Sequence, residues 1–230
     1  ALDISNNAAL ESLNCSYNDL TTLDVKNNTA LSSLIVADNR LTEIDVKSNA
    51  ALETLNVRHN LLTALDVSAN VLLTVMNCSD NNITMLDVSE NVALNELSAQ
   101  NNKLSTLDIS NNTLLKSLYA GNNKFSELDV SYNTALENLY IENNDVATLD
   151  ISKNILLKQL KAENNKLTTL DLSCNKQLYY LNCIGNNLFQ LIDFHFKKTL
   201  SFFCSIIFCI FRQVTFIACL SDSCHNLRAF

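Results

Sequence analysis

Residues 1–190 repeat one unit of 21 residues nine times without an insertion or a deletion. Residues 23–43 are one copy, Leu-Asp-Val-Lys-Asn-Asn-Thr-Ala-Leu-Ser-Ser-Leu-Ile-Val-Ala-Asp-Asn-Arg-Leu-Thr-Glu. A unit this short cannot bury its apolar face alone, so a fixed period of this length predicts that successive units stack on one another. We therefore expect a solenoid rather than a domain with one central core.

Each unit divides into two unequal halves. Both halves read Leu-x-x-Leu-x-apolar-x-x-Asn, and they are 10 and 11 residues long. The Leu-x-apolar pattern is typical of a short strand whose alternate side chains face inward. So short a half, with an Asn at its corner, leaves no room for a helix of two turns. We predict one short strand per repeat on the main face, extended or second-sheet segments opposite it, and little or no helix in the repeats.

The two halves also carry a family resemblance. The segment Leu31-Ser-Ser-Leu-Ile-Val-Ala-Asp-Asn-Arg-Leu41 resembles the eleven-residue core of leucine-rich repeats. The following Thr42-Glu-Ile-Asp-Val-Lys-Ser-Asn49 resembles the second half of the nested-period, 21-residue class of bacterial and some protist proteins. The resemblance covers about residues 1–190. It implies a right-handed coil with a parallel β-sheet along one face, usually used to bind proteins, an extracellular or cell-surface location, and no enzyme activity.

Charge and residue types narrow the function further. The repeats hold 12 Lys or Arg against 22 Asp or Glu, whereas residues 191–230 hold 4 against 2. Nucleic acid is not an expected partner, because neutralising phosphates requires a basic surface. Only His59 of the three His lies in the repeats, and no nucleophile, base and orienting group can be assembled on one face. We predict neither an enzyme nor a cofactor.

Two columns of Asn recur at the corners of the coil. The first ladder consists of Asn18, Asn39, Asn60, Asn81, Asn102, Asn123, Asn144, Asn165 and Asn186. The second consists of Asn7, Asn28, Asn49, Asn70, Asn91, Asn112, Asn133, Asn154 and Asn175. An inward Asn amide can satisfy backbone N–H and C=O groups that a turn would otherwise leave without partners. We expect both ladders to be structural.

A column of Asp lies between inward Leu and Val residues and should therefore point outward. It consists of Asp3, Asp24, Asp45, Asp66, Asp87, Asp108, Asp129, Asp150 and Asp171. Like charges about 5 Å apart repel by roughly 1 kcal/mol in water, so the column needs compensation. Local backbone N–H groups at a tight turn can supply it, helped by Ser or Lys two residues on. The alternative is capture of Ca²⁺, for which Asp66, Asp87, Asp108 and Asp129 are the candidates.

Ligand specificity can reside only in residues that differ between coils, at outward positions equivalent to 12, 14 and 16. Early coils carry small polar residues there, whereas Tyr119, Tyr140 and Lys161 follow one another in later coils. The surrounding candidates are Glu96, Glu142, Gln159, Glu163 and Tyr180. Exposed Tyr residues edged by charges resemble a protein-binding hot spot, although a cross-strand Tyr pair can also simply stabilise a sheet.

Two functions remain open at this point. The first is a recognition scaffold that binds a protein or a glycan on this variable face. The second is a structural or adhesive surface rod stabilised by cations on the Asp column.

The two ends of the chain differ from the repeats. The chain begins within a unit, without Met or a signal peptide, which predicts an N-terminally truncated array over residues 1–190. Residues 191–230 form a non-repeat tail that holds eight of the ten Phe. This tail could cap the stack, could result from out-of-frame translation, or could anchor the chain in a membrane through residues 200–220.

The cysteines do not suggest a disulfide framework. Cys15, Cys78 and Cys183 occupy one inward position that Val or Ile fills in other coils, where a thiol serves as a small apolar side chain. Cys15 and Cys78 are three repeats apart, roughly 14 Å at the strand spacing, which is too far for a bridge. We predict buried, reduced thiols.

Overall fold

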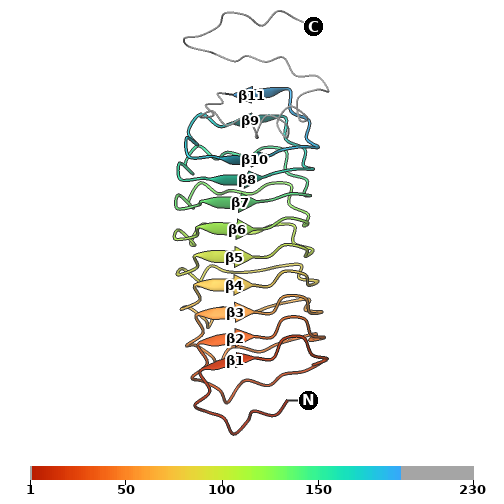
Figure 1. Ribbon diagram of the computed structural model, residues 1–230, viewed down its shortest axis with the longest axis vertical. Coiled ribbons are helices and arrows are strands. Elements are labelled where there is room, and N and C mark those ends of the chain that lie inside the picture. Colours follow the sequence, from red (N-terminus) through yellow and green to blue (C-terminus); the bar gives the residue numbers. More distant parts are fainter. Residues whose placement is uncertain (1, 193–230) are drawn as a thin grey trace, which may run out of the picture.

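The computed structural model describes residues 2–192, and the interpretations of the tail from residue 193 onward lie outside the described residues. The described chain is a stack of coils, one per repeat, that rises in a nearly straight column from the N-terminal to the C-terminal end (Figure 1). Residues 2–192 contain no helix, and hence none that could cross a membrane.

One face of the stack is a parallel sheet of nine three-residue strands in the order β1-β2-β3-β4-β5-β6-β7-β8-β10 (Figure 1). The strands are β1 (Ser12–Asn14), β2 (Ser33–Ile35), β3 (Thr54–Asn56), β4 (Val75–Asn77), β5 (Glu96–Ser98), β6 (Ser117–Tyr119), β7 (Asn138–Tyr140), β8 (Gln159–Lys161) and β10 (Tyr180–Asn182). Every residue of these strands pairs with the residue one repeat away, as Leu34 does with Leu55. The prediction of one strand per repeat on the main face is confirmed.

The opposite face is mostly extended chain without ladder pairing. A second parallel sheet forms only at the C-terminal end of the described residues, where β9 (Thr169–Asp171) pairs with β11 (Gln190–Ile192). The expectation of extended or second-sheet segments is therefore confirmed, with each form present in a different part of the stack.

The interior is a set of apolar columns that run along the stack. The central residue of each strand from β2 to β8 is fully buried, as at Leu34 and Leu97. Phe125 is also fully buried, in a column that Leu104 and Val146 fill in neighbouring coils. Cys78 lies in another column as a free thiol, and burial raises its pKa to about 12, as expected of a thiol that serves as a small apolar side chain.

The first Asn ladder uses both ends of the amide. Asn60 Nδ2 donates to the carbonyl oxygens of Val36 at 3.0 Å, Val57 at 3.0 Å and Arg58 at 3.2 Å. Its Oδ1 accepts the backbone N–H of Leu41 at 2.9 Å. The same four contacts recur at Asn39, Asn81, Asn102, Asn123, Asn144 and Asn165. Each of these side chains closes its own turn and ties it to the preceding coil.

The second Asn ladder uses only the amide nitrogen. Asn70 Nδ2 donates to the carbonyl oxygens of Val46 at 3.0 Å and Asn49 at 2.8 Å. Its Oδ1 is buried and has no hydrogen-bond partner in the described chain. The same carbonyl is left unpaired at Asn28, Asn49, Asn91, Asn112, Asn133, Asn154 and Asn175. The two ladders therefore stabilise their turns by different amounts, although they share one residue type.

Candidate binding surface

The outer side of β6, β7 and β8 carries an aromatic cluster that we call the tyrosine cluster, Tyr119, Tyr140 and Lys161. The in-register pairing of the three strands puts the three side chains in one row. The rings of Tyr119 and Tyr140 meet edge to face with centroids 5.0 Å apart, and Lys161 Nζ lies 4.4 Å from the centre of the Tyr140 ring. All three side chains are half-buried, so each still presents part of its surface to solvent.

Hydrogen bonds hold the tyrosine cluster in place. The hydroxyl of Tyr140 donates to Gln159 Oε1 at 2.6 Å, and Gln159 Nε2 donates to the hydroxyl of Tyr179 at 2.7 Å. The sequence predictions did not include Tyr179, which directly precedes β10. Tyr180 pairs in register with Gln159 on the same face. Tyr140 thus contacts two other predicted residues, Gln159 through its hydroxyl and Lys161 over the face of its ring.

Two further predicted residues, Glu142 and Glu163, lie in the turns that follow β7 and β8. Glu142 folds over Gly121 of the preceding coil, so that a Cβ placed on Gly121 would lie 2.5 Å from the Glu142 carboxyl carbon. One carboxylate oxygen of each Glu is covered and has no hydrogen-bond partner among the described residues. Burial, together with the charge of Glu142, raises the pKa of Glu163. The remaining candidate, Glu96, lies on β5, three strands away from Gln159.

The Asp column lies on the side of the stack away from the main sheet, and its carboxylates bind their own turns. Each of the nine accepts the backbone N–H of the residue two positions later at 2.8 to 3.1 Å. The hydroxyl and backbone N–H of Ser68 are the main causes that lower the pKa of Asp66 to about 2. The backbone N–H of Ser110 similarly lowers the pKa of Asp108. Local donors thus compensate much of the repulsion along the column.

The four calcium candidates lie along this column without converging on one point. Within residues 2–192, no three His, Cys, Asp or Glu side chains are grouped so that they could hold a metal ion. A shallow groove does cross this side of the stack, and its polar lining includes Thr106, Asp108, Glu127, Asp129, Tyr132 and Asp150. Asp66 and Asp87 do not line the groove.

The structure also shows a column that the sequence predictions missed, which we call the edge column. It lies immediately before the first Asn ladder and consists of Tyr17, Asp38, His59, Asp80, Asn101, Asn122, Asn143, Asn164 and Gly185. The first eight have φ between 50° and 56°, and Gly185 has φ of 72°. Asn, Asp, His and Gly are the residues that adopt this left-handed conformation most readily. Their recurrence at one position was the signal that could have identified the column.

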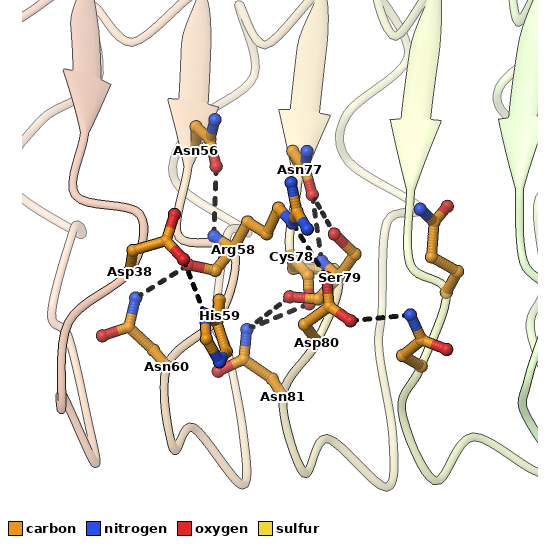
Figure 2. Close-up of polar contacts among 12 residues, drawn as sticks. Asp38, Asn56, Arg58, His59, Asn60, Asn77, Cys78, Ser79, Asp80 and Asn81 are labelled. Carbon is orange, nitrogen blue, oxygen red and sulfur yellow. Dashed lines mark hydrogen bonds and ion pairs between the residues drawn. The ribbon is translucent and has the colours of Figure 1, made fainter. Parts of the chain in front are cut away.

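Side chains of the edge column contact one another between coils. His59 Nδ1 lies 2.6 Å from Asp38 Oδ1, and Arg58 Nε donates to Asp80 Oδ2 at 2.8 Å (Figure 2). Farther along, Asn101 Nδ2 donates to Asp80 Oδ1 at 2.6 Å. His59 is exposed, and its ring links two coils through Asp38. These polar atoms already have partners within the chain.

The solved structures similar to this chain include two bacterial proteins that resemble it in both sequence and fold. The functional domain of InlJ from Listeria monocytogenes, which includes a cysteine ladder, is 31% identical with a TM-score of 0.68, over 83% of this chain and 55% of its own. A leucine-rich repeat protein of Leptospira interrogans is 26% identical with a TM-score of 0.75, over 80% and 51%. The chain spans about half the length of these two structures.

A third structure shows the fold alone. The leucine-rich repeat ectodomain of a plant membrane receptor kinase from Arabidopsis thaliana, in complex with Casparian strip integrity factor 2, is 22% identical with a TM-score of 0.74, over 82% of this chain and 25% of its own. A scan against protein-family models and a search of curated proteins gave no match.

Proposed function

We propose, on the premise that this chain is a leucine-rich repeat protein, that it is a non-enzymatic scaffold that binds a protein partner on the outer face of its main sheet. The similar bacterial structures include a leucine-rich repeat protein, and the Arabidopsis structure is a leucine-rich repeat ectodomain in complex with Casparian strip integrity factor 2, which supports a protein-binding scaffold. We further propose a secreted or cell-surface location, which the family resemblance favours.

The observation that carries the proposal is the tyrosine cluster. Outward residues on β1 to β3 are mostly small and polar, whereas β6 to β8 carry two tyrosines and a lysine in one row. The edge-to-face rings, the lysine above one ring and the hydrogen bond to Gln159 hold these side chains in fixed positions before any partner arrives. Rigid aromatic anchors lose little conformational entropy on binding, which is why they dominate the energy of many interfaces.

The test removes the anchors and leaves the coil intact. Peptides selected from a displayed random library on the intact chain serve as probes, and their affinity is measured for the wild type and for Tyr119→Ala/Tyr140→Ala. We expect a loss of at least about 2 kcal/mol, because truncation of hot-spot residues typically costs that much. The control is Ser33→Ala/Ile35→Ala, which truncates the same face at β2 and should leave the affinity unchanged. Equal affinities of the two double variants would contradict the proposal.

The alternative, a structural or adhesive rod stabilised by cations, has less support. Its Asp carboxylates already accept backbone N–H groups, and the remaining oxygens do not converge on a common point. A tight Ca²⁺ site needs six to eight oxygen ligands that converge on the ion. Calorimetric titration with Ca²⁺ tests it, since heat of binding together with a rise in melting temperature would revive this function.

A further inference from the structure

Glu142 and Glu163 are held in an arrangement that disfavours their negative charges. They occupy equivalent positions in adjacent coils, with Asn143 N bonded to Glu163 O at 2.8 Å between them. Each has one covered carboxylate oxygen without a hydrogen-bond donor, and neither forms an ion pair within residues 2–192. Like charges in a partly dry environment destabilise each other, and unmet acceptors add to the cost. The free chain therefore gains no evident stability from this pair of carboxylates.

Gly121 is part of the same arrangement. The Glu142 carboxylate lies where a side chain at position 121 would be, so Ala there would meet it at 2.5 Å. Equivalent positions in the preceding coils are Arg58, Ser79 and Gln100. Gly121 carries no positive φ that would require glycine. Glycine at this position leaves room for the Glu142 carboxylate beside Tyr119, at the end of β6.

In the described part of the chain, Lys161 is the one nearby positive charge that acts on Glu163, and it forms no ion pair with either Glu, so a positively charged group from outside would supply what the pair lacks. Guanidinium suits the arrangement better than ammonium, because its planar fork offers five N–H donors and can bond two carboxylates while it stacks on an aromatic ring. Tyr119 and Tyr140 lie beside the pair at the ends of the preceding strands, and Lys161 is occupied over the Tyr140 ring. Charge complementarity therefore indicates an arginine, in a position next to the aromatic anchors.

We propose that Glu142 and Glu163, with Gly121 leaving room for them, form the seat for an arginine side chain of the protein that docks on the tyrosine cluster. This inference rests on the proposed function, since the arginine arrives as part of the same partner. It adds the chemical class of the partner, a segment that carries an arginine next to residues that contact the two tyrosines.

The experiment uses the intact chain and peptides from a displayed random library, kept only if they lose affinity for Tyr119→Ala/Tyr140→Ala. Their affinity is then measured for Glu142→Gln/Glu163→Gln and for the control Glu43→Gln/Glu90→Gln, which removes two exposed charges elsewhere. We expect the first variant to weaken binding at least about tenfold and the control to change it less than about twofold. Gly121→Ala, which displaces Glu142 without changing charge, should also weaken binding. Replacing the peptide arginine by lysine should weaken it too.

The outcomes separate the two proposals. Peptides that need the tyrosines but contain no arginine, or that bind Glu142→Gln/Glu163→Gln as well as the wild type, overturn the arginine seat and leave the scaffold function standing. A failure to obtain any peptide that depends on the tyrosines overturns both. A second readout is the melting temperature of the free chain, which should stay the same or rise in Glu142→Gln/Glu163→Gln. A fall of several degrees would mean that the pair stabilises the coil, and would overturn the seat.

Discussion

The two Asn ladders predict different penalties for the same substitution. Asn60→Ala removes an amide with two N–H groups directed at three carbonyl oxygens and an Oδ1 that accepts from Leu41. Counted as three satisfied hydrogen bonds, the loss is about 3 kcal/mol, and the fully buried N–H of Leu41, left without an acceptor, adds about 1 kcal/mol or more. We therefore expect Asn60→Ala to lower the free energy of unfolding by about 4 kcal/mol.

Asn70→Ala should be much milder. Its amide nitrogen donates to two carbonyl oxygens, which gives a loss of about 2 kcal/mol. The substitution also removes a buried Oδ1 that has no partner in the described chain, which returns about 1 kcal/mol. The expected net loss is about 1 kcal/mol, although Asn70 is 0% exposed and Asn60 is 4% exposed. Burial alone would predict the opposite order or no difference.

The assay is urea unfolding of the wild type, Asn60→Ala and Asn70→Ala, followed by the circular dichroism of the sheet. The two positions lie ten residues apart on neighbouring corners, so differences in local cooperativity along the stack have little influence on the comparison. Equal slopes with denaturant are required before midpoints are converted to free energies. Exposed Asn6→Ala is the control and should change stability by less than about 0.5 kcal/mol. A loss for Asn70→Ala equal to or larger than that for Asn60→Ala would refute the hydrogen-bond accounting.

Three further predictions concern other parts of the stack. Because hydrogen bonds from Ser68 depress the pKa of Asp66 from 3.8 to about 2, its ionised form stabilises the fold above pH 3.8, and that contribution is lost as the pH falls to about 2. Asp66→Asn should therefore flatten the dependence of the melting temperature on pH in this window, and an unchanged dependence would contradict the prediction. Phe125→Ala should lower the free energy of unfolding by about 3–5 kcal/mol in the same urea assay, since the ring is fully buried, and a loss below about 1 kcal/mol would contradict this packing. In the native chain, iodoacetamide should modify exposed Cys174 and spare Cys78, because burial raises the pKa of Cys78 to about 12 and blocks access of the reagent. Peptide mass spectrometry measures the labelling, and equal labelling of the two cysteines would refute the prediction.

The sequence was sufficient to predict the coil because every structural demand is repeated. A strand of three residues such as Ser33–Ile35 carries little information alone, but the same spacing in nine copies leaves no other packing for its leucine. Each copy also pairs with the next in the register that the period dictates. The pairing of β9 with β11 was harder to predict, because Thr169–Asp171 has the same pattern as equivalent segments that remain extended without ladder bonds.

The candidate surface was predictable in position but not in detail. Tyr119 and Tyr140 had to share a row, because residues one period apart pair across neighbouring strands. The position of the Glu142 carboxylate over Gly121 and the hydrogen bond between Gln159 and Tyr179 depend on side-chain conformations that the repeat does not dictate. Because these conformations do not follow from the repeat, its periodicity does not predict the direction in which such a side chain points.

The edge column shows why residue identity within a repeat has to be read together with backbone conformation. Asn164 and Asn165 are adjacent and identical, yet the first has φ of 52° and an exposed side chain, whereas the second is buried and bonded at both ends of its amide. The column of Asn164 accepts Asp, His, Tyr or Gly because its requirement is a left-handed backbone. The column of Asn165 accepts only Asn because its requirement is one donor group and one acceptor group of fixed geometry. Differences in residue type between coils therefore point to function only at positions where the fold requires neither a left-handed backbone nor a fixed donor and acceptor. In this chain the outward positions of the main sheet are free of both requirements.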